Sequence, residues 1–246
     1  MSTKTDRDVA AALARQGYSF ASFEPPSGLM EKVMSGWSKY LALPTEEREK
    51  WRVGDPKDWD DGYVYRERSD DKKHFFHFRP YLFALLEHAG ADYSAHIKWL
   101  EDLDALWHFS HQRFYEVLVG LDCEVPGYGF AHKFMSPAPR SKHVIRLLSY
   151  ENAMTPGMQL GKPHIDRNFG TFQLHETHPA LVLEFPDPVD YKPIAGHTLV
   201  FTGAKAQKLT EGKLRGVCHS VVVPKDFVPQ ANERPRQSAV FFAHTS

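Results

Sequence analysis

His164 and Asp166 place an imidazole and a carboxylate two positions apart in the chain. In a β-strand, side chains at i and i+2 project from the same face, so one metal ion can contact both. A third ligand must come from elsewhere, and His219 is the best candidate because it lies in the strand-like run Val217–Val221. Two imidazoles and one carboxylate on adjacent strands are typical of non-haem Fe(II) sites, which keep three coordination positions open. For the His-x-Asp tripeptide alone, a surface strand with a His–Asp hydrogen bond remains the alternative.

Arg236 and Ser238 form a second pair on one face, at the start of the last apolar strand. A guanidinium beside a hydroxyl suits a carboxylate of a dicarboxylic acid, because both groups donate charge-assisted hydrogen bonds. The alternative is an arginine at a sheet edge that pairs with Glu233 or with solvent.

Other histidine clusters fit metal chemistry less well. His175 and His178 superficially resemble the helix of zinc proteases, but that motif needs histidines at i and i+4, and Pro179 would break the helix. His74 and His77 would share a face of a helix, where packing in the core or at its rim is the expected role. Cys218 precedes His219 and points to the opposite face of the strand, where we expect a small buried residue.

Composition excludes several classes of protein. The 246 residues carry 30 Lys and Arg against 31 Asp and Glu, with no long basic run, which argues against a nucleic-acid partner. Apolar stretches are too short to span a membrane, and the N-terminus lacks the apolar segment of a secretory signal. Two distant cysteines give no disulfide framework. We therefore expect a cytoplasmic protein with a small-molecule substrate and no membrane partner; the oligomeric state stays open.

Residues 1–135 are predicted to be mostly helical. Apolar residues recur every four positions at Leu29, Val33, Trp37 and Leu41. Pro44 should end that helix, and Thr45 should cap the next one. A polar and aromatic segment over 51–68 has no helical period, and a long helix is expected over 93–121, with its aromatic stripe in the core.

Residues 136–246 change to short β-rich runs separated by Gly, Pro, Asn and Asp. These runs are Val144–Tyr150, Pro163–Asp166, Thr171–Leu174, Ala180–Phe185, Thr198–Thr202, Val217–Val223 and Ser238–Phe242. Their spacing predicts a β-sandwich or jelly roll. Pro137 and Pro139 lead directly into a strand, so no flexible linker is expected near 135. We predict one mainly β domain over 1–246, with the helical region packed on a jelly-roll core.

Several further segments occur in a fixed order along the chain. They are Leu41–Lys50, Gly62-Tyr63 followed by Asp70–Phe76, Arg146–Tyr150 before His164-x-Asp166, Pro193–Gly203 and Gln207–Gly212 before His219, and Arg236-x-Ser238. In this order the chain resembles the isopenicillin N synthase-like branch of the 2-oxoglutarate/Fe(II)-dependent dioxygenases over most of its length. The ordered set is specific, whereas any single segment is not.

The resemblance implies a double-stranded β-helix and oxidation of a small molecule. It implies His164, Asp166 and His219 as Fe(II) ligands, and Arg236, Ser238 and Tyr150 on the distal carboxylate of 2-oxoglutarate. With O₂, the keto acid would be decarboxylated to succinate and CO₂ while an unactivated C–H of the substrate is oxidised, by default to an alcohol. The alternatives are an Fe(II) oxidase that does not use 2-oxoglutarate and a non-enzymatic metal-binding module.

The chain departs from the family pattern after its distal histidine. Sixteen residues, 220–235, separate His219 from Arg236, which is more than is usual in the family, and we interpret 224–235 as a lengthened loop. The sequence given stops soon after the arginine strand, so we expect the 51–80 segment, the 224–235 loop or a partner chain to cover the site.

Substrate contacts are expected near the metal motif and among aromatic residues. Arg167 and Asn168 follow the motif at the end of a strand, and Arg167 would hold a substrate carboxylate unless it is simply an exposed turn residue. The predicted aromatic walls are Tyr63, Tyr65, Phe134 and Phe169.

Overall fold

The computed structural model describes residues 6–54, 61–67, 72–137, 142–151, 154–185, 187–229 and 235–244. Its helices are α1 Asp6–Gln16, α2 Leu29–Leu41, α3 Thr45–Glu49, α4 Leu82–His88, η1 Ser94–His96, α5 Ile97–Glu124, α6 Phe130–Met135 and α8 Ala204–Leu209. Its strands are β1 Tyr18–Ser22, β2 Arg52–Val53, β3 Asp61–Arg66, β4 Lys73–Phe78, β5 Val144–Tyr150, β6 Gln159–Ile165, β7 Gly170–Glu176, β8 Leu181–Phe185, β9 Asp187–Asp190, β10 His197–Thr202, β11 Cys218–Val222 and β12 Gln237–Ala243.

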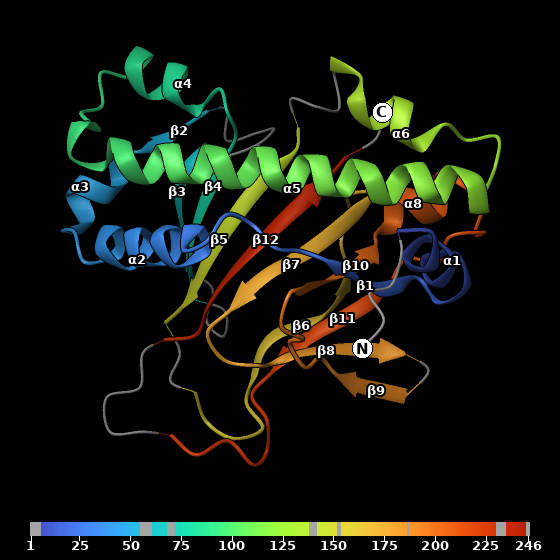
Figure 1. Cartoon of the computed structure of the whole chain (residues 1–246). Coiled ribbons are helices and arrows are strands. Elements are labelled where there is room, and N and C mark those ends of the chain that lie inside the picture. Colours follow the sequence, from blue (N-terminus) through green and yellow to red (C-terminus); the bar gives the residue numbers. More distant parts are fainter. Residues whose placement is uncertain are drawn as a thin grey trace.

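The strands form two antiparallel sheets. The larger sheet has eight strands in the order β1-β10-β7-β12-β5-β4-β3-β2, and the smaller has four in the order β6-β11-β8-β9. Helices α2 and α5 lie across one face of the large sheet (Figure 1). A second apolar cluster contains residues of both sheets, among them Leu160, Leu183 and Phe201, so the small sheet packs on the other face. This mainly β arrangement with flanking helices confirms the predicted jelly roll.

The N-terminal region contributes more strands than the sequence predicts. Strand β1 lies in the alternating, strand-like run Tyr18–Phe23 and pairs with β10, whereas β2, β3 and β4, which are not predicted, extend the large sheet beyond β5. The prediction of a mostly helical region is therefore incomplete. In β4, Lys73-His-Phe-Phe-His-Phe78 is buried or half-buried at every position, so the strand has no alternation of polar and apolar residues to reveal it.

The predicted helices are present with small shifts at their ends. Helix α2 buries Leu29, Val33 and Trp37 on one face. Helix α5 begins later than predicted because Ser94–His96 forms a separate 3₁₀ turn. Within the described ranges, no helix combines the length and hydropathy that crossing a membrane requires.

Thr45 does not cap α3 as predicted. It is the first residue of the helix, Pro44 precedes it with an extended ψ of 146°, and no side chain caps the helix end. The Thr45 hydroxyl instead accepts a hydrogen bond from the Arg48 guanidinium at 3.0 Å. The Pro44 carbonyl accepts the first hydrogen bonds of the helix, from Glu47 N at 3.0 Å and Arg48 N at 3.1 Å.

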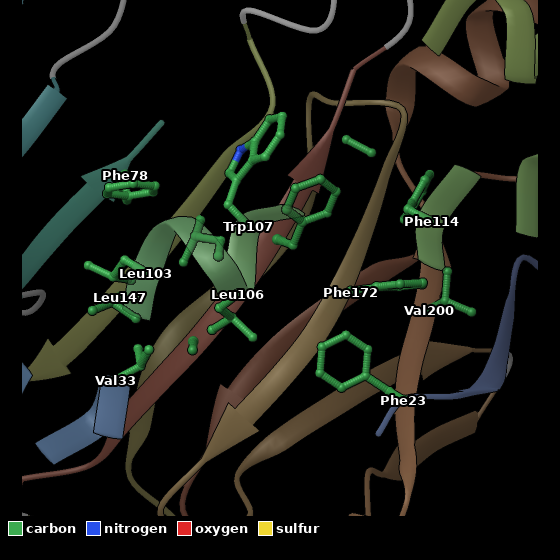
Figure 2. Close-up of a cluster of buried hydrophobic side chains, with 14 of the residues drawn as sticks. Phe23, Val33, Phe78, Leu103, Leu106, Trp107, Phe114, Leu147, Phe172 and Val200 are labelled. Atoms are coloured by element: carbon green, nitrogen blue, oxygen red, sulfur yellow. The ribbon is translucent and has the colours of Figure 1, made fainter. Parts of the chain in front are cut away.

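The aromatic stripe of α5 lies in the core between the helices and the large sheet (Figure 2). Trp107 and Phe114 are almost fully buried, and the Phe114 ring centroid lies 4.9 Å from that of Phe172 on β7. These contacts confirm the predicted packing role of the stripe. They also show that the helices cover one face of the large sheet, which leaves the opposite face to line a cavity.

We predict that Phe114→Ala lowers the free energy of unfolding by about 3–5 kcal/mol, because it removes a buried ring and leaves a cavity. Val119→Ala on the same helix is the matched control, since Val119 is 45% exposed, and should cost about 0.5 kcal/mol or less. Urea unfolding monitored by circular dichroism measures both values. Equal effects of the two substitutions would contradict the proposed core.

Candidate metal centre and cavity

The pairing of β6 with β11 brings the predicted metal ligands together. His164 lies directly opposite His219 in the antiparallel register, with ring centroids 4.4 Å apart. Asp166 follows the end of β6, and its Oδ1 lies 3.6 Å from His164 Nε2 and 3.9 Å from His219 Nε2. One ligand atom from each residue lies within 4.8 Å of the others. Two segments of the chain, the end of β6 and strand β11, thus bring two nitrogens and one oxygen close together.

Backbone carbonyls orient both imidazoles. His164 Nδ1 lies 2.8 Å from the Lys162 carbonyl oxygen, and His219 Nδ1 lies 3.3 Å from that of Val217. A carbonyl only accepts, so each Nδ1 carries the proton and each Nε2 presents its lone pair toward Asp166. This is the tautomer that a metal ligand needs.

The three ligand residues differ in exposure. The side chain of His219 is 7% exposed, that of Asp166 is 14% exposed and that of His164 is 53% exposed. Burial lowers the pKa of His219 and outweighs the opposing effect of Asp166, so the imidazole is held neutral. Neutral imidazoles with a carboxylate form the donor set that Fe(II) accepts, and the residues therefore fit the metal that the sequence predicts.

Two polar side chains hold the Asp166 carboxylate through its Oδ2 atom. Thr171 donates a hydrogen bond to Asp166 Oδ2 at 2.7 Å, and Asn168 Nδ2 donates to the Thr171 hydroxyl at 3.1 Å. These bonds leave Oδ1 directed at the two imidazoles. Asn168, predicted as a substrate contact, borders the cavity but is buried and supports the metal carboxylate.

The turn after the metal motif rests on the backbone at the start of α8. Ala204 N donates to the Asp166 carbonyl at 2.7 Å, and Lys205 N donates to the Asn168 carbonyl at 3.1 Å. A Cβ on Gly203 would lie 2.3 Å from the Asn168 carbonyl oxygen and 2.8 Å from that of Asp166. Glycine is therefore required at 203 by close approach of two backbones, and this contact holds Asp166 in place.

A cavity of about 900 Å³ extends from the metal ligands between the sheets. Its far end contains Tyr150, Arg236 and Ser238, the predicted contacts of 2-oxoglutarate. On β5 and β12, alternate residues face this cavity while the residues between them face the helical core. The two sets of predicted site residues thus border one space.

Arg236 is buried and already has an acidic partner. Its guanidinium forms an ion pair with Glu176 of β7, its Nε donates to the His178 carbonyl at 3.1 Å, and its Cζ lies 5.3 Å from the Tyr150 ring centroid. Sequence reasoning missed Glu176, whose role appears only when the register pairs it with Ser238. Glu233, the partner considered from the sequence, lies outside the described residues. The ion pair fixes the guanidinium at the cavity wall without using all of its five N–H donors.

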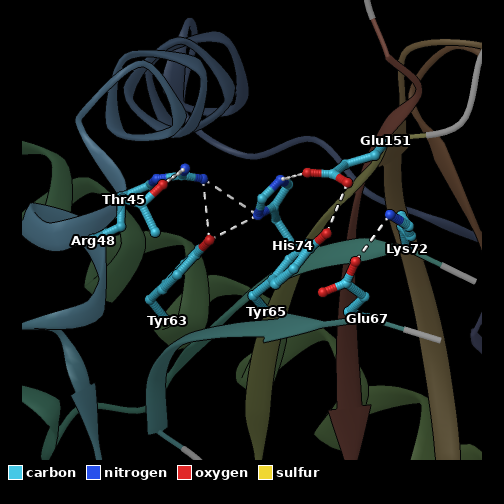
Figure 3. Close-up of polar contacts among 8 residues, drawn as sticks. All are labelled: Thr45, Arg48, Tyr63, Tyr65, Glu67, Lys72, His74 and Glu151. Carbon is cyan, nitrogen blue, oxygen red and sulfur yellow. Dashed lines mark hydrogen bonds and ion pairs between the residues drawn. The ribbon is translucent and has the colours of Figure 1, made fainter.

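Tyr63 and Tyr65, predicted as pocket walls, are not part of the cavity lining. Tyr63 shares a hydrogen-bond network with Arg48 and His74, at 3.1 and 2.8 Å, and Tyr65 donates to Glu151 at 2.9 Å (Figure 3). His74 and His77 stand on opposite faces of β4, so the shared helical face considered from the sequence is wrong. In a strand, neighbouring residues point to opposite faces. Because nearly all residues of β4 are aromatic or histidine, the sequence does not show which residues share a face.

The other two predicted aromatic walls also belong to the core. Phe134 stacks on His143 with centroids 4.1 Å apart, and Phe169 contacts Phe130 at 5.2 Å. Cys218 is half-buried rather than buried, while Arg167 is exposed at the rim of the cavity. Of the expected covers, 55–60, 68–71 and 230–234 lie outside the described residues, as do Asp70 and Asp71 of the family-like segment.

We predict that Gly203→Ala weakens Fe(II) binding about 10-fold or more, since the added methyl displaces the Asp166 turn. The same overpacking should lower the free energy of unfolding by about 1–3 kcal/mol. Ala204→Ser is the control, because position 204 is exposed. Anaerobic calorimetric titration with Fe(II) measures the change, and native affinity in Gly203→Ala would show that this contact does not hold the ligand.

Comparison with known proteins places this geometry in a structural context. No protein-family model matches the chain, and no curated protein matches its sequence. Solved structures do match. A Caulobacter crescentus protein, provisionally assigned to the 2OG-Fe(II) oxygenase family, is 20% identical, with a TM-score of 0.75 over 98% of this chain and 81% of that one.

Two further matches were crystallised with ligands. A full-length Neurospora crassa protein in complex with alpha-KG and thymine is 16% identical, with a TM-score of 0.77 over 98% of this chain and 80% of that one. The Arabidopsis thaliana dioxygenase for auxin oxidation 1, in complex with 2-oxoglutarate, is 14% identical, with a TM-score of 0.72 over 98% and 88% of the two chains. The chain therefore has the jelly-roll fold of the 2-oxoglutarate/Fe(II) oxygenases, with a His-Asp-His cluster in its cavity.

Proposed function

We propose that this chain is a 2-oxoglutarate- and Fe(II)-dependent oxygenase of the isopenicillin N synthase-like branch. It oxidises a C–H bond of a small organic molecule, by default to an alcohol. When bound, Fe(II) supplies the chemistry by which O₂ is divided between succinate and product while CO₂ is released. The observation that carries the proposal is the convergence of His164, Asp166 and His219 at one end of a large cavity.

The chain's own residues perform three tasks in this proposal. His164, Asp166 and His219 hold the metal through two Nε2 atoms and one carboxylate oxygen. Arg236, Ser238 and Tyr150 bind the distal carboxylate of 2-oxoglutarate, the guanidinium being oriented by Glu176. Arg236 and Ser238 are buried, which strengthens their polar contacts because little water competes for them.

The arrangement of Arg236 favours this function over the two alternatives. An oxidase that draws all electrons from its substrate has no need of a cation and a hydroxyl beside the cavity. A non-enzymatic metal-binding module needs no cavity of about 900 Å³ beside the ion. The neighbours crystallised with alpha-KG or 2-oxoglutarate add support from the same fold.

We predict that the protein releases succinate when supplied with Fe(II), ascorbate, O₂ and 2-oxoglutarate, and that His164→Ala abolishes this release together with tight Fe(II) binding. His132→Ala, an exposed histidine on α6, should behave as the native protein does. O₂ consumption that is independent of 2-oxoglutarate would identify the oxidase instead. Tight metal binding without any turnover, across a screen of small-molecule substrates, would identify the non-enzymatic module.

We predict that Ser238→Ala raises the KM for 2-oxoglutarate about 10-fold or more, because a hydrogen bond to a charged carboxylate is lost. Ser149→Ala is the matched control. Ser149 lies on the paired strand β5, outside the cavity lining. Initial rates of succinate release give both constants, and an unchanged KM in Ser238→Ala would remove this residue from the cosubstrate site.

A further inference from the structure

The cavity contains a second cationic position that the proposed function does not use. Alternate residues of β5 line the cavity, and they are Arg146, Leu148 and Tyr150. Arg146 pairs across the sheet with Val240, whereas Tyr150 bonds to the backbone of Arg236. Phe242, two residues beyond Val240, pairs with Thr171, which holds Asp166. Arg146 therefore lies toward the metal ligands, and Tyr150 lies toward the cosubstrate contacts.

One molecule of 2-oxoglutarate is too short to need both positions. Four residues of strand separate the α-carbons of Arg146 and Tyr150 by about 13 Å. Four C–C bonds of about 1.5 Å limit the five-carbon diacid to about 6 Å. The diacid anchored at Arg236 and Ser238 is shorter than this α-carbon separation, and we therefore consider Arg146 as the anchor of a second ligand.

Contacts with an imidazole and two aromatic rings hold Arg146 in place. Its Nε donates to His77 Nε2 at 2.8 Å, and its Cζ lies 4.7 Å from the Phe242 ring centroid and 5.4 Å from that of Phe75. Within the described part of the chain, no acidic side chain forms an ion pair with it, in contrast to Arg236 with Glu176. Two rings and an imidazole therefore hold the guanidinium of a residue that lines the cavity.

The charge at Arg146 favours an anionic ligand. Burial is the largest cause that lowers the pKa of its guanidinium, to about 10, so the group stays charged at neutral pH in a poorly solvated place. The neighbouring basic residues add to this potential. Among the residues that the structure describes, the cavity lining contains one acidic residue, Asp166, against six lysines and arginines, which are Arg66, Lys73, Arg146, Lys162, Arg167 and Arg236.

We propose that the substrate is an organic carboxylic acid distinct from 2-oxoglutarate, whose carboxylate pairs with Arg146 and whose apolar body lies along Phe75, Leu148 and Val240. This proposal rests on the proposed oxygenase function. The planar guanidinium can donate two parallel hydrogen bonds to a carboxylate, which fixes both position and orientation. Arg167, which the sequence offered either for this task or as an exposed turn residue, is exposed at the rim of the cavity, so the proposal assigns the carboxylate to Arg146.

The test compares acids with the primary amides of the same acids. Benzoate with benzamide, phenylacetate with phenylacetamide, and hexanoate with hexanamide are titrated into protein saturated with Fe(II) and 2-oxoglutarate without O₂. Each acid should bind about 10-fold or more tightly than its amide in the native protein. This preference should fall to about one in Arg146→Gln, remain in part in Arg146→Lys and persist in Arg167→Gln.

Each remaining outcome overturns the proposal. These outcomes are the absence of acid binding, equal binding of acids and amides, a preference that survives Arg146→Gln, and a preference lost only in Arg167→Gln. Thermal melting of the variants confirms that they fold. A separate titration with 2-oxoglutarate tests the proposed function independently. If 2-oxoglutarate does not bind but the acids still bind more tightly than their amides in an Arg146-dependent way, the proposed oxygenase function is wrong and the proposed anion site at Arg146 stands.

Discussion

The register between β6 and β11 is the constraint on which the candidate site depends. It places His164 directly opposite His219. A slip of one residue would reverse the faces of β11, moving Cys218 into the cavity and His219 out of it. The metal ligands therefore owe their convergence to the ladder of backbone hydrogen bonds, and the packing of the small sheet on the large one holds that ladder in place.

The large sheet separates two different tasks. Its helical face packs Trp107, Phe114 and Phe172 into a dense aromatic core, which supplies rigidity. Its other face carries Arg146, Ser238 and related polar residues toward the cavity. Because neighbouring residues on a strand point to opposite faces, each strand serves both tasks. Polar groups placed by such a framework keep their geometry without relying on a flexible loop.

The sequence revealed those features that depend on local spacing. The i, i+2 rule found His164 with Asp166 and Arg236 with Ser238, and the four-residue period found α2. It did not reveal which face an aromatic residue occupies, so Tyr63 and Phe134 were wrongly expected in the pocket. The positions of Glu176 beside Arg236 and of Arg146 in the cavity lining follow from the pairing of distant strands, which no local sequence pattern predicts. The strands β3 and β4 were missed because a segment buried on both faces shows no alternation.

The two histidines of the candidate metal centre differ in their exposure to solvent. His219 is buried between the two sheets, whereas more than half of the His164 side chain surface is open to solvent. Exposed side chains change rotamer within nanoseconds, while packed ones are restrained. Asp166 and His219 therefore form the shielded side of the cluster, and His164 forms the side that faces solvent.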